Sequence, residues 1–181
     1  MRSVDGPEAL VVVLVGTDHH PFDRLVEWSL SLADEGWSNW YVQYGTSHWP
    51  QRTPGGVEGA TVLGIETLTP LLGKASAVIT HAGPGLLMDA QLAGHTPVVV
   101  PRDPARGEHV DDHQQRFVRH LGGSDRILPA DSLDSLRSQV RRAMAARRQQ
   151  PVRGLDNAAT VARFTSLVDA TVQRRQRAVR R

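Results

Sequence analysis

The sequence predicts an α/β fold, namely a Rossmann-like, open and mainly parallel sheet with helices on both faces. Short apolar runs that suit buried strands alternate with segments whose apolar residues recur at helical spacing. Glycine-rich turns join several of these runs to the next helix. The clearest case has a β-branched strand over residues 76–80, the turn His81-Ala82-Gly83-Pro84-Gly85, a helix ending at Ala93-Gly94 and a second strand over residues 96–101. This order defines a βαβ unit with a right-handed crossover.

The first half of the chain follows the same alternation. An apolar run bounded by glycines predicts a buried strand, and the helical segment after it begins at Pro21, a residue favoured in a first helical turn. A stretch rich in glycine and proline, with little periodicity, predicts a loop before the third strand. In chain order we expect a strand over 10–15, a helix over 21–33, a strand over 40–44, a loop over 45–59, a strand over 61–65 and a helix over 67–72.

The second half adds a charged loop, a short strand and amphipathic helices. Pro151 and Gly154 set off the terminal helix, so we expect one domain over residues 1–150 and a C-terminal helix with a basic tail over 151–181. We expect a loop over 102–108, a helix over 109–121, a strand over 126–128, and helices over 132–148 and 156–174.

Composition limits the class of protein. A chain of 181 residues, 40% apolar and 22% charged, suits one globular domain. The absence of cysteine excludes thiol catalysis and cysteine-ligated zinc and fits a reducing cytoplasm. The apolar run over 9–15 is far shorter than the roughly 20 residues of a membrane span, and it lacks the basic flank of an export signal. We therefore expect a cytoplasmic protein.

Basic residues concentrate late in the chain, although the formal net charge is only +2. The arginine-rich end is either a solvated helical tail or a surface for an anionic membrane or partner. A nucleic-acid binder is disfavoured, because aromatic residues make up only 5% and do not interleave with the basic ones. An apolar stripe in the terminal helix fits three alternatives equally well: the helix covers apolar surface at the open side of the cleft, docks on a partner protein, or contacts a second copy in a homo-oligomer.

The turn at His81 is the first candidate binding element. It lies where a strand should end and a helix begin, so glycine backbone N–H groups could approach a phosphate and the imidazole could donate to a phosphate oxygen. Plain turn chemistry is the alternative. Asp89 lies one helical turn past Gly85, where its carboxylate could accept hydrogen bonds from a ribose. A solvated aspartate near a helix start is the alternative there.

Two further polar segments would meet the same crevice. Residues 108–115 open a predicted helix with side chains suited to sugar hydroxyls, or with an ordinary acidic first turn. Residues 16–24 follow the first strand and include His19 and His20, which are either acid–base residues or exposed loop histidines. The spacing of His109 and His113 invites a metal, but the glutamate of a zincin motif is missing, so we expect no metal.

These segments resemble a known family. In order, they are Gly16-Thr17, Pro21-Phe22-Asp23-Arg24-Leu25, Val42-Gln43-Tyr44-Gly45, His81-Ala82-Gly83-Pro84-Gly85, Pro97-Val98-Val99-Val100-Pro101 and Asp112-His113-Gln114. Together they resemble the glycosyltransferase family 28 C-terminal domain over residues 10–122. The likeness is strongest to its stand-alone versions, the donor-binding subunit of the two-part UDP-N-acetylglucosamine transferase of the dolichol pathway and bacterial relatives in polysaccharide synthesis.

The resemblance implies the nucleotide-sugar half of a GT-B fold, with the acceptor half on a separate membrane-associated protein. It implies no cofactor, because the UDP-sugar is a substrate. Asp18 stands where relatives often carry histidine, and a carboxylate there would repel a diphosphate unless it is paired. The implied roles are diphosphate binding by Gly16, Thr17, His81, Ala82, Gly83 and Gly85, ribose binding by Asp89, sugar binding by Asp112, His113, Gln114 and Gln115, and uracil binding near Ile65.

Two functions follow as hypotheses. The first is an inverting glycosyltransferase subunit that, with its partner at the inner face of the cell membrane, transfers a sugar from UDP to a lipid-linked acceptor. Its general base would lie on the partner or, within this chain, at His19. The second is a non-catalytic UDP-sugar-binding module that activates a partner glycosyltransferase.

Overall fold

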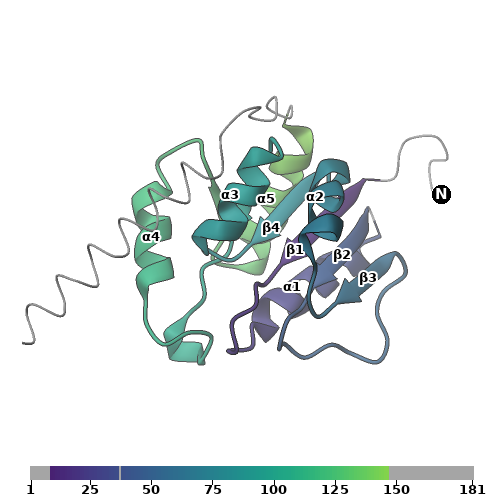
Figure 1. Cartoon of the computed structure of the whole chain (residues 1–181), viewed down its shortest axis with the longest axis horizontal. Coiled ribbons are helices and arrows are strands. Elements are labelled where there is room, and N and C mark those ends of the chain that lie inside the picture. Colours follow the sequence, from purple (N-terminus) through teal and green to yellow (C-terminus); the bar gives the residue numbers. More distant parts are fainter. Residues whose placement is uncertain (1–8, 37, 147–181) are drawn as a thin grey trace, which may run out of the picture. The chain divides into compact units, whose positions relative to one another are not determined.

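The computed structural model describes residues 9–36 and 38–146, and these residues form one parallel sheet flanked by helices (Figure 1). The strands are β1 (Leu10–Leu14), β2 (Asn39–Gln43), β3 (Val57–Ala60), β4 (Ala77–Thr80), β5 (Val98–Val99) and β6 (Leu128–Pro129). The helices are α1 (Asp23–Asp34), α2 (Ile65–Lys74), α3 (Pro84–Leu92), α4 (His113–Leu121) and α5 (Leu133–Ala145), with a 3₁₀ turn, η1, at Pro104–Arg106.

The strand order is β3-β2-β1-β4-β5-β6, and every neighbouring pair is parallel. The chain therefore runs outward from β1 to β3, returns to the centre at β4, and then runs outward in the other direction. In open sheets of this kind, ligands bind beyond the carboxyl ends of the strands where the order reverses, here between β1 and β4. The predicted Rossmann-like fold class is confirmed.

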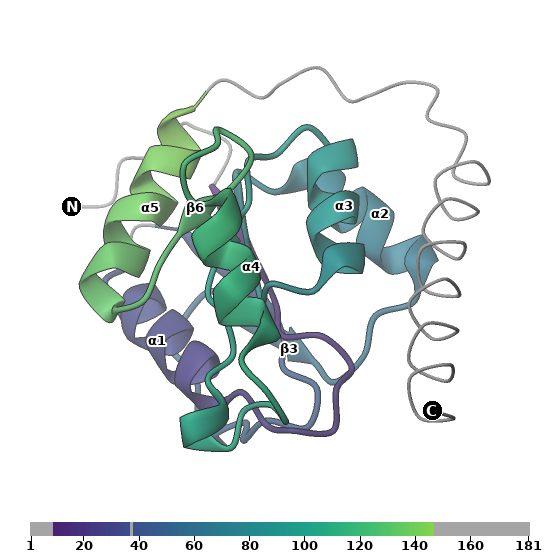
Figure 2. The same cartoon turned by 90° about the vertical axis from the view of Figure 1, so that its left-hand side faces the viewer.

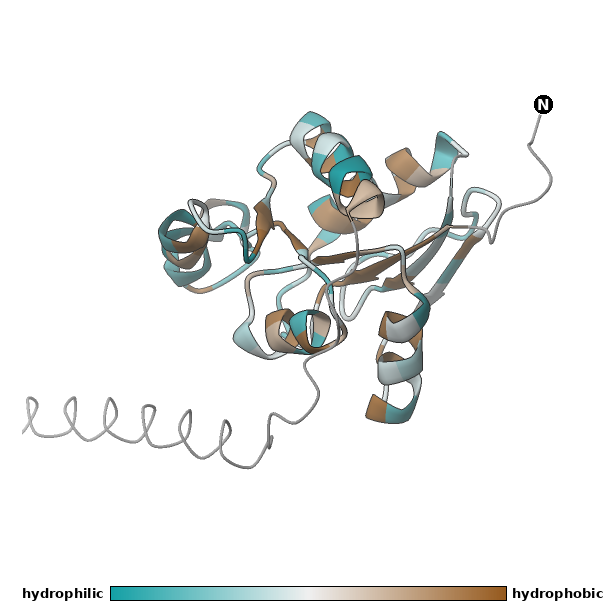
Figure 3. Ribbon diagram, turned by 90° about the horizontal axis from the view of Figure 1, so that it is seen from above, coloured by the Kyte–Doolittle hydropathy of each residue, from teal (hydrophilic) through white to brown (hydrophobic). Residues whose placement is uncertain are grey.

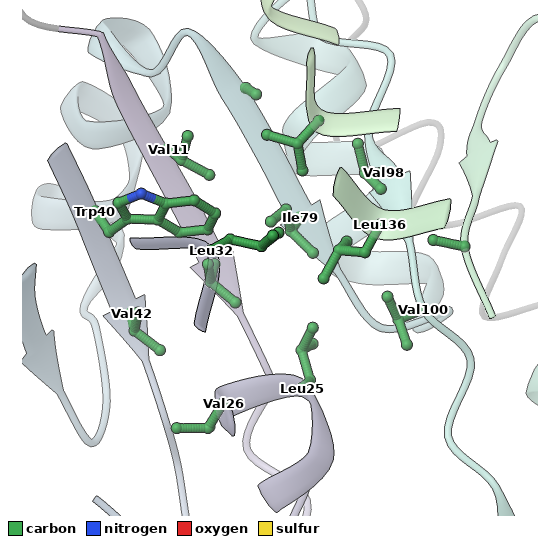
Figure 4. Close-up of a cluster of buried hydrophobic side chains, with 14 of the residues drawn as sticks. Val11, Leu25, Val26, Leu32, Trp40, Val42, Ile79, Val98, Val100 and Leu136 are labelled. Atoms are coloured by element: carbon green, nitrogen blue, oxygen red, sulfur yellow. The ribbon is translucent and has the colours of Figure 1, made fainter. Parts of the chain in front are cut away.

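Alternating side chains of the central strands supply the two faces of the core. Val11 and Val13 join the apolar layer beneath α1 and α5, whereas Val12 and Leu14 join the layer beneath α2 and α3. The two helix layers flank the sheet in Figure 2, and the strands between them are apolar in Figure 3. Figure 4 shows Trp40 gathered with Val11 in the first layer. Because both faces are covered, the strand ends are where polar chemistry can lie.

The predicted strand over 61–65 is wrong. The third strand is Val57–Ala60, which lies almost wholly inside the stretch predicted as a loop over 45–59, and Ile65 begins α2 instead. β3 is an edge strand with partly exposed residues, so it lacks the apolar run of a buried strand. Its Gly59 makes room for Trp49, since an added Cβ would lie 2.5 Å from that ring. The apolar letters that suggested a strand include Val62 and Ile65, which are both largely exposed.

Other boundaries differ by less. The helix expected from His109 begins at His113, because the Asp111 carboxylate accepts a hydrogen bond from the His113 backbone N–H and holds a turn there. Ser132 caps α5 as a capping box with Ser135. The predicted helix over 156–174 and the division at residue 151 lie outside the described residues. Among the described helices, none combines the length and the apolar character needed to cross a membrane.

Candidate functional site

A cavity of about 430 Å³ opens at the carboxyl ends of β1, β2 and β4, beside the point where the strand order reverses. Its walls differ in character: one is apolar and the other carries glycines and polar side chains. The apolar wall comprises Leu14, Leu63, Leu68 and Leu86, and the remaining lining residues are Gly16, Thr17, Asp18, Gln43, His81, Gly83, Pro84 and Gly85. Of the predicted diphosphate-binding residues, only Ala82 does not line this cavity, and it is buried beneath the turn.

The His81 imidazole is packed between two glycines. A Cβ added to Gly16 would lie 2.6 Å from His81 Nε2, and one added to Gly83 would lie 2.1 Å from His81 Cε1. Gly16 also has a φ of +86°, which side chains disfavour. The histidine therefore requires both glycines, and its contact with Gly16 joins two segments that the sequence pattern does not reveal as neighbours.

His81 is held in its neutral form. Burial lowers its pKa to about 4, and the nearby Arg102 guanidinium acts in the same direction. At neutral pH the imidazole therefore interacts with a ligand through hydrogen bonding rather than through a full charge.

The N-terminus of α3 supplies donors for an anion. Its N-cap residue Gly83 makes no side-chain capping bond, and Pro84 occupies the first helical position. The first N–H bonded within the helix is that of Leu87, to the Gly83 carbonyl, which leaves the N–H groups of Gly85 and Leu86 for a ligand. Apart from its chain neighbours and the nearby backbone of its own helix, no described residue lies within 4 Å of the place a Cβ on Gly85 would occupy. Because Gly85 has no side chain, this space at the cavity wall stays open.

Gln43 fixes the glycine turn after β1. Its Oε1 accepts from the Gly16 N–H at 2.9 Å, and its Nε2 donates to the Gly16 carbonyl at 3.0 Å and to the Thr61 carbonyl at 2.7 Å. One buried amide thereby joins the ends of three neighbouring strands. In the sequence, Gln43 stands out only as part of a motif, which indicates no role for it. A polar residue at the end of an otherwise apolar strand was the available signal.

A buried ionic network fixes the loop after β5 against the turn after β1. Arg102 is 1% exposed and donates to the carbonyls of Val15, His20 and Glu108 at 2.7–2.9 Å. The Glu108 carboxylate also accepts two hydrogen bonds from Arg24, at 2.8 and 2.7 Å. The sequence had predicted only a charged loop here, because nothing in its letters shows which charges become buried.

Gln114, predicted to bind the sugar, braces the site from beneath. It is 3% exposed, and its Oε1 accepts from the backbone N–H groups of Ala82 and Arg102, both at 3.2 Å. It therefore joins the His81 turn to the loop after β5. The other predicted sugar-binding residues lie at the start of α4: Asp112 pairs with Arg116 and His113 with Asp111, while Gln115 is only partly buried. None of the four lines the cavity.

The predicted ribose and uracil residues lie at the margin of the cavity. Asp89 is half-buried in α3, one turn beyond the lining residues, and burial raises its pKa. Ile65, the first residue of α2, is 67% exposed, and it lies between Leu63 and Leu68 in the sequence. The apolar wall near Ile65 is therefore built by α2 and the segment before it.

Histidines and aspartates gather beside the polar wall. The His20 ring lies 2.6 Å from Asp18, and the His109 ring lies between Asp18 and Asp111, with Nε2 at 3.9 Å from the first and Nδ1 at 3.5 Å from the second. His19, the predicted base, contacts Asp18 only at 3.8 Å, and its side chain is 84% exposed.

Two groups have ligand atoms close enough to suggest a metal, namely Asp18-His19-His20 and His109-Asp111-His113. Nitrogen and oxygen ligands of one tetrahedral zinc ion lie roughly 3.3 Å apart. The 2.6 Å separation of Asp18 and His20, and the still shorter one of Asp111 and His113, are those of hydrogen-bonded pairs. Each pair is arranged to fix an imidazole.

Asp18 carries a full negative charge at neutral pH. Burial alone would raise its pKa, but hydrogen bonds from the backbone and ring of His20 and the field of Arg102 lower the pKa to about 2. The carboxylate that the sequence flagged as repulsive to a diphosphate is thus paired, although it remains on the wall of the cavity.

Comparison with solved structures identifies the fold. CalG4, the calicheamicin glycosyltransferase, superposes with a TM-score of 0.59 at 20% identity, over 96% of this chain and 44% of that one. The solution structure of ALG13 gives a TM-score of 0.51 at 18% identity, over 84% of this chain and 92% of that one. The fold is that of one half of a GT-B glycosyltransferase.

The model of the glycosyltransferase family 28 C-terminal domain matches residues 10–168, so the chain belongs to this family. A curated relative, UDP-N-acetylglucosamine transferase subunit ALG13 of Yarrowia lipolytica, is 32% identical over 126 residues. That match covers 64% of this chain and 62% of the relative. The predicted family is confirmed.

Proposed function

We propose that this chain is a glycosyltransferase subunit that binds a UDP-sugar in the cavity between β1 and β4. The single observation that carries the proposal is the pair of N–H groups at Gly85 and Leu86, which have no backbone partner and belong to residues that line the cavity beside a neutral His81 at the switch point of the sheet. Membership of family 28 supports the same conclusion.

The two walls of the cavity divide the donor between them. The diphosphate lies against the N-terminus of α3, where the helix dipole and the free N–H groups favour negative charge. The uracil ring lies against the apolar wall beside Leu63 and Leu68, and Asp89 accepts from the ribose. As the bond between sugar and diphosphate breaks, the leaving UDP gains charge, which the same N–H groups stabilise without rearrangement. The sugar faces Asp18 and the start of α4.

A partner completes the enzyme in this proposal. The chain spans 62% of its ALG13 relative, which is itself named as a subunit, and 44% of the glycosyltransferase CalG4. The partner is membrane-associated and supplies a lipid-linked acceptor, which attacks with inversion at the sugar carbon. Closing the cleft between the two proteins would position acceptor and donor and exclude water.

Calorimetric titration of the purified chain with UDP, UDP-N-acetylglucosamine, UDP-glucose and GDP tests donor binding. We expect uridine-selective binding, weakened about tenfold in Asp89→Ala by loss of a charge-assisted hydrogen bond. Asp34→Ala, which removes an exposed carboxylate of α1 that does not line the cavity, is the matched control. Equal affinity for GDP and UDP, or no nucleotide binding, would contradict the proposal.

A further inference from the structure

Transfer of a sugar to a hydroxyl group requires a base that removes the hydroxyl proton. Five imidazoles lie in or beside the cavity: His81 in its wall, His19, His20 and His109 in the neighbouring loops, and His113 at the start of α4. Their hydrogen bonds differ, and these bonds decide which ring has a nitrogen available to accept a proton.

His20 is the most firmly oriented of the five. Its Nδ1 lies 2.6 Å from Asp18 Oδ1, and its backbone N–H donates to the same oxygen at 2.7 Å. Its carbonyl accepts from the buried Arg102 guanidinium at 2.7 Å. The carboxylate fixes the tautomer with the proton on Nδ1, so Nε2 carries the free lone pair. A base oriented by a carboxylate in this way is the arrangement that activates hydroxyl groups elsewhere in enzymes.

The other imidazoles fit the role less well. His109 Nδ1 accepts from the Asp111 backbone N–H, so its proton is on Nε2, which faces Asp18. His81 resists protonation, since burial lowers its pKa to about 4. His19 is 84% exposed and has no short contact with a carboxylate.

His113 is also held by a carboxylate, that of Asp111, but the two side chains are about half exposed, and neither residue lines the cavity. Asp18 does line it, next to Thr17 and Gly16. Among the described histidines, only His20 therefore combines a free Nε2, a fixed ring and a partner on the cavity wall.

We propose that His20 is the catalytic base of this chain and that Asp18 is its positioning residue, an inference that rests on the proposed function. The acceptor hydroxyl gives its proton to His20 Nε2 as its oxygen forms the new bond to the sugar carbon. The bond from that carbon to the diphosphate oxygen breaks, and its electron pair leaves with UDP. Asp18 stabilises the imidazolium, which afterwards loses its proton to solvent.

Hydrolysis of UDP-N-acetylglucosamine by the purified chain tests this role, because water can replace the unidentified acceptor. We expect His20→Gln to lower UDP release about 100-fold or more while its affinity for UDP stays within about twofold. Added imidazole should restore part of the rate, which a merely structural role would not allow. Asp18→Asn should also slow release, since it no longer fixes the tautomer or stabilises the imidazolium. His120→Gln, on the exposed end of α4, is the matched control.

The outcomes separate this inference from the function on which it rests. Unchanged release in His20→Gln, with UDP still bound, would overturn the base assignment and leave the proposed function standing. A larger loss in His19→Gln than in His20→Gln would overturn it as well. So would a wild-type chain that binds UDP-N-acetylglucosamine without releasing any UDP, because an oriented base should activate water there. Failure to bind any uridine nucleotide would overturn the proposed function itself.

Discussion

The segments Asp18-His19-His20 and Asp111-Asp112-His113 make the same local hydrogen bonds in different surroundings. In each, the aspartate accepts from the backbone N–H and from the ring of the histidine two residues later. In each, these bonds lower the aspartate pKa, against the opposing effect of burial, which is the larger single influence only at Asp18. Only the first pair is anchored by buried Arg102 and has its aspartate on the cavity wall. The local pattern builds the pair, and the tertiary surroundings determine whether it can act on a ligand.

Replacing Arg102, which anchors the Asp18–His20 pair, should leave that pair as weakly held as Asp111–His113. This substitution should have the largest effect that we expect. Arg102→Met leaves three carbonyls, two of them in buried hydrogen bonds, without their donor, so the free energy of unfolding should fall by about 3 kcal/mol or more, and UDP release should fall with it. Urea unfolding measures the change. Arg116→Met, which removes an exposed pair with Asp112, should cost less than about 0.5 kcal/mol. Similar losses in the two variants would show that the burial of Arg102 is not decisive.

Acid should lower the stability of the fold through the buried imidazole of His81 more than through the exposed imidazoles. His81 has a pKa of about 4 in the folded chain, below the ordinary value of 6.5. The unfolded chain therefore binds the proton more readily, and stability should fall as the pH drops from 6.5 towards 4, by up to about 3 kcal/mol. Denaturant unfolding at several pH values across this range measures the free energy of unfolding. In His81→Gln this free energy should depend less steeply on pH. An identical slope in the variant would contradict the burial of His81 as a neutral ring.

The same substitution at two glycines of the His81 turn compares one residue type in two different surroundings. Gly83→Ala places a methyl group against the imidazole, so we expect a loss of about 1–3 kcal/mol. Gly85 lies in α3, and a methyl group added there meets open space, so Gly85→Ala should raise stability by about 0.5–1 kcal/mol. The same methyl group should weaken UDP binding, because it intrudes on the space of the donor. Thermal melts and titration with UDP separate the two effects. Gly85→Ala with undiminished affinity would place the diphosphate elsewhere.

The smallest expected effect compares the two carboxylates directly. Asp18→Asn removes a negative charge from the cavity wall, and UDP should bind about fivefold more tightly. Asp111→Asn removes a charge from the solvent-exposed pair, where screening should keep the change within about twofold. Calorimetry of both variants at one ionic strength measures the difference. Weaker UDP binding in Asp18→Asn would mean that this carboxylate contributes to holding the donor.

The fold and the centre of the site were predictable because their signals are local. The apolar run of β1 and the glycine turn at His81 each determine a strand end or a helix start without help from distant residues. β3 was missed because an edge strand needs few apolar residues, and its Gly59 serves a contact with Trp49. The strand predicted over 61–65 rests instead on apolar residues such as Val62, which is exposed in the structure.

The supports of the site were not predictable from local pattern. Arg102 and Gln114 act through hydrogen bonds to backbone groups brought close only by folding. Gln114 was assigned to the sugar by resemblance, and the structure buries its oxygen against two N–H groups. Whether its neighbours Asp112, His113 and Gln115 contact a sugar stays a prediction, as do the roles of Asp89 and Ile65.

A crystal structure of the chain with UDP tests the donor site most directly. We expect the diphosphate within hydrogen-bond distance of the Gly85 and Leu86 N–H groups and beside His81, with uracil against Leu63 and Leu68. A diphosphate bound elsewhere, for example in the second cavity of about 400 Å³ beside Gln139 and Arg142, would contradict the proposed donor site.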